Sequence, residues 1–118
     1  MKVLFHIVTF LAWLMPHMLS AQTEGEYPGN YASAPRFHAL FCYDPYAEEA
    51  HVQFDKQALA FFHKLSYGEG YTYKVVTSMK GMTVDSLRQY DIVVWLNFQP
   101  GGEERKAFQE YMEQGGGW

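Results

Sequence analysis

The sequence predicts an α/β fold: a parallel sheet with helices on both faces. Two segments, 37–43 and 91–97, are almost continuously apolar, which is typical of strands buried on both faces of a parallel sheet. Strand-like and helix-like segments alternate along the chain with short connections, which indicates parallel strands joined by right-handed crossovers. Three strands and the start of a fourth are expected, so we expect the sheet to be incomplete.

The N-terminus has the pattern of a secretory signal peptide over residues 1–21. Lys2 precedes an apolar run, 3–15, which is too short for the roughly 20 residues of a membrane-spanning helix. Small residues then precede Gln22. A buried N-terminal helix or strand is the alternative. Residues 22–36 are rich in Gly, Pro and small polar types and predict a flexible leader before a domain over 37–118.

An amphipathic helix is expected after the first strand. Asp44 and Pro45 end that strand with a turn signal, and the helix should start between residues 47 and 55. It should end near Ser66, since two glycines follow. Apolar residues at helical spacing predict its inward face. They are Phe54, Ala58, Phe61, Phe62 and Leu65.

The next elements follow from local signals. Residues 71–77 are dense in Tyr, Thr and Val and predict a strand, in which Lys74 suits an edge position. Thr83 is a plausible N-cap for a short helix over 84–90, before the third strand at 91–97.

The C-terminal helix follows a Pro-Gly-Gly turn at residues 100–102. Glu103 and Glu104 stand where the positive end of a helix dipole favours negative charge. Three glycines end this helix, and Trp118 has the position of the first residue of another strand. The expected inward residues are Phe108, Tyr111 and Met112.

Composition and motifs exclude several functions. The net charge of −4 and the lack of a basic run give no footprint for nucleic acid or for an anionic membrane. Cys42 is the single cysteine; it excludes an intrachain disulfide and is expected as a small buried hydrophobe rather than a nucleophile. The sequence has no dinucleotide fingerprint, phosphate loop, nucleophile elbow or metal-binding motif. It therefore identifies no cofactor.

The switch-point rule for parallel sheets predicts where a ligand would bind. If the second strand lies on one side of the first and the third strand on the other, strand order reverses between the first and third strands. Ligands bind at such points, outside the carboxyl ends of the strands. The connections 43–51 and 97–102 then line the candidate site.

Four residues in these connections are candidates. His51 continues the apolar stripe towards the cleft as an acid or base, although a capping or merely exposed histidine is equally consistent. Asp44 is a ligand-binding candidate or a turn residue, and Asn97 a ligand-binding candidate or a strand terminator. Tyr46 has a ring that can stack on a sugar. His63 is expected on the surface.

Two segments resemble the trehalose-utilisation (ThuA-like) family: the strand DIVVWLN at 91–97 and the helix with its triple glycine at 103–118. The resemblance implies a class I glutamine-amidotransferase-like, flavodoxin-like fold and a role in handling sugars. By resemblance, His51 matches the histidine that follows the family's first strand. The family's second histidine would come just after Trp118.

Together these features lead us to expect an exported protein, periplasmic or extracellular, involved in disaccharide utilisation. A non-catalytic carbohydrate-binding or scaffold module on the same fold is the alternative. The expected partner is a small sugar, with no nucleic acid and no membrane association after signal cleavage.

Overall fold

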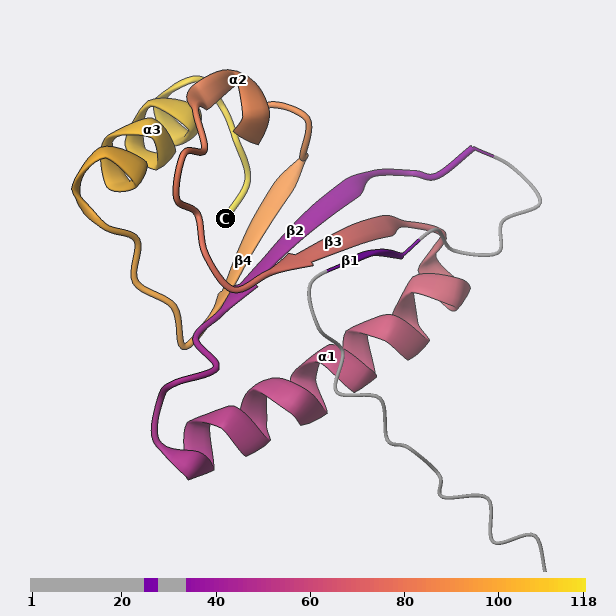
Figure 1. The fold of residues 1–118 in the computed structure, drawn as a ribbon. Coiled ribbons are helices and arrows are strands. Elements are labelled where there is room, and N and C mark those ends of the chain that lie inside the picture. The colour runs from indigo at the N-terminus through magenta and orange to yellow at the C-terminus, as the bar shows by residue number, and fades with distance from the viewer. Residues whose placement is uncertain (1–24, 28–33) are drawn as a thin grey trace, which may run out of the picture.

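A computed structural model describes residues 25–27 and 34–118, and the predicted signal peptide lies outside them. One four-stranded sheet carries three helices (Figure 1). The strands are β1 (Gly25–Tyr27), β2 (His38–Tyr43), β3 (Thr72–Val76) and β4 (Ile92–Leu96). The helices are α1 (Glu49–Glu69), α2 (Val84–Leu87) and α3 (Gly102–Glu113).

The sheet has the order β1-β3-β2-β4, and β3, β2 and β4 run parallel. Phe41 of β2 pairs with Val75 on one side and with Val94 on the other, so the first predicted strand is flanked by the other two. This arrangement confirms the predicted α/β, flavodoxin-like parallel sheet and its strand order. The point where strand order reverses lies between β2 and β4.

The short strand β1 falls within the predicted leader. It pairs antiparallel with β3, placing Glu26 opposite Lys74. The expectation that Lys74 marks an edge strand is therefore wrong, because β3 has a neighbour on each side. Lys74 itself is half-buried.

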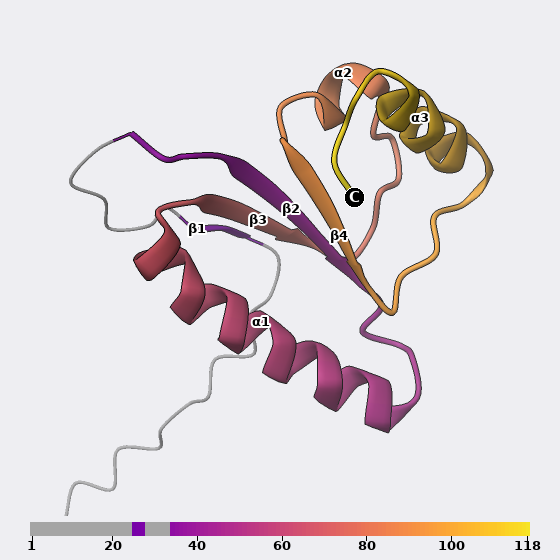
Figure 2. The same ribbon diagram turned by 180° about the vertical axis from the view of Figure 1, so that it is seen from behind.

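Helices cover both faces of the sheet (Figures 1 and 2): α1 lies on one face, and α2 and α3 lie on the other. Side chains alternate between the faces along each strand. Phe41 and Tyr73 therefore join Leu59 in the core beneath α1, while Leu40 and Val93 belong to the core beneath α2 and α3. The second core includes the predicted inward residues Phe108, Tyr111 and Met112.

Helix α1 is rotated relative to the predicted stripe. Phe54 is 59% exposed and Phe61 is 61% exposed, whereas Leu59 is buried together with two polar residues, Asp55 and Ser66. Asp55, Leu59 and Ser66 stand at i, i+4 and i+11, so they share one face. The apolar pattern missed this face because two of its three most buried members are polar.

The helix ends follow the expected capping chemistry. Gly70 ends α1 with a φ of 66°, a left-handed conformation that glycine adopts readily, and its N–H donates to the Ser66 carbonyl over 2.9 Å. Thr83 caps α2 in a reciprocal capping box with Ser86, as the sequence predicts, although α2 ends at Leu87 rather than at Tyr90. Within the described ranges no helix is both long and apolar enough to span a membrane.

After α3 the chain returns to the free edge of β4. Gly117 bridges to Ile92 in parallel, through the Val93 N–H to the Gly117 carbonyl at 3.0 Å and the Gly117 N–H to the Asp91 carbonyl at 3.1 Å. A Cβ atom at residue 117 would lie 2.7 Å from the Asp91 carbonyl oxygen, so only glycine fits without a shift. The predicted approach of a further strand is confirmed by this pairing.

Candidate functional site

The candidate site lies at the carboxyl ends of β2 and β4. Tyr43 and Leu96, the last residues of these strands, are paired in the sheet, so the residues that follow them leave the sheet side by side. From this edge one connection leads to α1 and the other to α3 (Figures 1 and 2). The same edge therefore receives Asp44, Asn97 and the first turn of α1, which carries His51.

His51 and Asn97 are in contact across 46 residues of sequence. Nδ1 of His51 lies 3.0 Å from Oδ1 of Asn97. An amide oxygen only accepts hydrogen bonds, so Nδ1 carries the hydrogen and donates it. Nε2 of the neutral imidazole is then an acceptor, and no described residue is bonded to it. Both side chains are exposed, so Nε2 is accessible to a ligand.

The backbone at Asn97 explains why an asparagine ends β4. Its φ is 50°, and it is the one non-glycine residue with positive φ among the described residues. Asparagine enters this left-handed region more readily than most residues, whereas a β-branched residue would be strained there. The turn of the backbone at this point presents the amide to His51.

Asp44 and Tyr46 have different roles from each other. Oδ1 of Asp44 accepts a hydrogen bond of 2.9 Å from the Tyr46 N–H, which is the turn-making role that the sequence left open. Asp44 still lies at the same edge of the sheet as His51, and its negative charge acts on Asp55 of α1. The Tyr46 side chain is 94% exposed.

Asp55 is the residue of this site that the sequence did not reveal. Its side chain is fully buried, and neither carboxylate oxygen has a hydrogen-bond partner among the described residues. Burial raises the pKa of Asp55, the positive charge of His51 opposes that rise, and the negative charge of Asp44 adds to it. The charges of His51 and Asp44 therefore both act on Asp55, and His51 also contacts Asn97.

Two further sequence predictions have clear outcomes. Cys42 is fully buried, and burial raises the pKa of its thiol to about 12, so it is an inert core residue as expected. The surface position predicted for His63 is wrong. His63 is half-buried, and its Nδ1 shares a hydrogen bond of 2.7 Å with the Tyr73 hydroxyl, because the rotation of α1 turns this residue towards β3.

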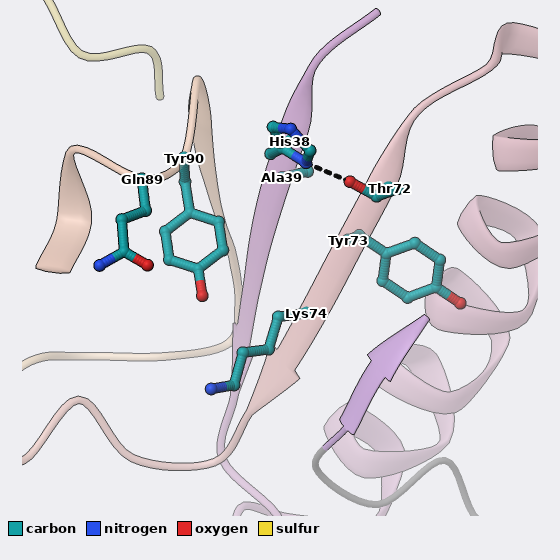
Figure 3. Close-up of a pocket in the computed structure, with 7 residues that line it drawn as sticks. All are labelled: His38, Ala39, Thr72, Tyr73, Lys74, Gln89 and Tyr90. Atoms are coloured by element: carbon teal, nitrogen blue, oxygen red, sulfur yellow. Dashed lines mark hydrogen bonds between the residues drawn. The ribbon is translucent and has the colours of Figure 1, made fainter. Parts of the chain in front are cut away.

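A second concave region lies at the opposite, amino end of the strands. This pocket of about 310 Å³ is bordered by Lys74 of β3 on one side and by Gln89 and Tyr90 on the other (Figure 3). His38 and Thr72, joined by a hydrogen bond, close its end. It lies at the edge of the sheet that parallel α/β proteins do not ordinarily use for ligands.

No group of three or more His, Cys, Asp or Glu side chains in the described ranges is arranged to hold a metal ion. At the carboxyl-end site, the groups that a ligand can reach are the His51 imidazole, the Asn97 amide and the Asp44 carboxyl. Such a set can bind the hydroxyl groups of a polar ligand and can exchange protons with it.

No family model matches this chain, and no curated protein matches it. Among solved structures, a "putative ThuA-like protein" from Bacteroides uniformis is similar, with 49% sequence identity and a TM-score of 0.69 over 78% of this chain. This neighbour supports the ThuA-like family for the chain. The match covers 38% of the length of the ThuA-like neighbour.

Proposed function

We propose that this chain is part of an exported ThuA-like protein that acts on a carbohydrate, with a disaccharide as the substrate class and His51 as the acid or base. The contact between His51 and Asn97 at the carboxyl ends of β2 and β4 carries the proposal. It joins two candidate residues from different connections at the place where parallel sheets bind ligands. The similarity to the ThuA-like neighbour supports it.

The chemistry of the pair suits a sugar. Asn97 holds the imidazole in the tautomer whose Nε2 accepts a hydrogen bond or a proton from a sugar hydroxyl. The Asp44 carboxylate, which lies at the same edge of the sheet, can accept a hydrogen bond from a second hydroxyl group of the sugar. We further propose that the fold continues as a class I glutamine-amidotransferase-like domain, with Gly117 leading into the next parallel strand.

Export is a proposal that rests on the N-terminal sequence. The short apolar run after Lys2 and the small residues before Gln22 support a signal peptide that is removed after Ala21. A periplasmic or extracellular protein would meet disaccharides before their uptake, which agrees with the proposed substrate class.

Calorimetric titration with trehalose tests the function. The His51→Gln variant should bind trehalose about 3- to 10-fold more weakly than the unmodified protein, the loss expected for one hydrogen bond. The matched control is His38→Gln, the same change at an exposed histidine at the amino end of β2, away from the candidate site, which should leave affinity unchanged.

Equal affinity in the two variants would contradict the proposal. If trehalose binds through His51 but remains chemically intact after long incubation, the non-catalytic binding module is the correct alternative. Conversion of trehalose that is lost in His51→Gln would establish an enzyme.

A further inference from the structure

Asp55 lies in an environment that is unfavourable for a carboxyl group. It is fully buried on the inner face of α1, and both of its oxygens lack hydrogen-bond partners in the part of the chain that the structure describes. A buried polar group without a partner destabilises the folded state. Leucine at this position would remove that cost, so the carboxyl is a feature that stability alone does not explain.

The position of Asp55 on α1 points to His51. Residues four apart on a helix are neighbours, with Cβ atoms roughly 5–6 Å apart. Helical side chains also lean towards the N-terminus of the helix. Asp55 on α1 is therefore a neighbour of His51, one helical turn away, and the charge of His51 acts on it.

The charged groups around Asp55 come from two segments. His51 lies on its own helix, and Asp44 lies in the connection after β2; the charges of both act on Asp55. Tyr43, buried on the face of the sheet beneath α1, adds a titratable phenol. His51 is the group of this set that can carry a positive charge, so it is the natural counter-ion.

We propose that Asp55 is a positioning residue for His51: a buried carboxyl that, once ionised, stabilises the protonated imidazole from one helical turn away. Asn97 and Asp55 then have complementary roles. Asn97 fixes the imidazole orientation through Nδ1, and Asp55 favours the imidazolium that forms when Nε2 takes a proton from a ligand. The inference deepens the proposed function and rests on it, but its test needs no ligand.

The test is a titration of the full chain that follows the ¹³Cγ resonance of Asp55 with pH, assigned with Asp55→Asn. In the unmodified protein, the pKa of Asp55 should lie above the ordinary value of about 3.9, because the group is buried. In His51→Gln it should rise further, because the opposing positive charge is gone. In the matched control His38→Gln it should equal that of the unmodified protein.

An unchanged Asp55 titration in His51→Gln would overturn the inference, as would an equal shift in the two histidine variants. An ordinary pKa for Asp55 would also overturn it. Since His51 and His38 are both exposed, the variants are expected to keep the fold, which backbone spectra verify. Weak trehalose binding with the expected Asp55 shifts would instead reject the proposed substrate while the pairing stands.

Discussion

Replacing Leu59 with alanine should lower the free energy of unfolding by about 2–5 kcal/mol, as for other large-to-small changes in a core. Leu59 lies on the buried face of α1, is 2% exposed and belongs to the same core cluster as Phe41 of β2. The matched change Phe54→Ala, five residues earlier on the same helix, should alter that free energy by no more than about 0.5 kcal/mol, because the Phe54 ring is 59% exposed.

Urea unfolding followed by circular dichroism measures both values. The comparison tests the rotation of α1, on which the placement of His51, Asp55 and His63 depends. A larger loss for Phe54→Ala than for Leu59→Ala would restore the apolar stripe predicted from the sequence. It would also move Asp55 out of the core.

The second large effect is a gain in stability. Asp55→Leu should raise the free energy of unfolding at neutral pH by about 1–3 kcal/mol, because it removes a buried carboxyl that has no hydrogen-bond partner in the described structure. Active-site groups often carry such a cost, so a gain in stability together with a loss of ligand response would fit a functional role.

The gain should depend on pH, with a sign that follows from the raised pKa of Asp55. A carboxyl whose pKa is higher in the folded state binds more protons there than in the unfolded state. Its contribution to stability is therefore present below the unfolded value of about 3.9 and is lost as pH rises through the folded pKa. The difference in free energy of unfolding between Asp55→Leu and the unmodified protein should therefore increase as pH rises across that window.

Asp55→Asn separates the cost of burying a polar group from the cost of ionising it, since asparagine keeps a buried polar group but cannot ionise. The free energy of unfolding of Asp55→Asn should equal that of the unmodified protein at low pH and should exceed it only as pH rises through the window. Urea unfolding at several pH values measures it. An advantage that stays constant with pH would show that the carboxyl does not titrate in the core.

The sequence predicted the sheet well because strong local signals and topology agree. The apolar segments around Phe41 and Val93 are buried strands, and the order of the three parallel strands follows from short right-handed connections. The face of α1 could not be predicted in the same way. A pattern of apolar residues overlooks Asp55 and Ser66, and it treats the exposed ring of Phe54 as core.

The site was predicted in part for similar reasons. The switch-point rule placed both His51 and Asn97 in the connections that line the site, but their contact depends on the left-handed backbone of Asn97. The apolar stripe that also pointed to His51 is not the buried face of α1. Asp55 could not be found, since an acidic residue in an amphipathic helix is ordinarily exposed. The spacing of Asp55 four residues after His51 was the available signal.

The central claim is that the carboxyl ends of β2 and β4 form the carbohydrate site, and chemical-shift mapping with trehalose tests it most directly. Amide resonances of Asp44, of residues 46–51 and of Asn97 should shift with increasing trehalose concentration. Those of residues that border the amino-end pocket, such as Thr72, Lys74 and Tyr90, should not. Shifts confined to the amino-end pocket, or the absence of shifts at His51 and Asn97 at saturating trehalose, would contradict the account.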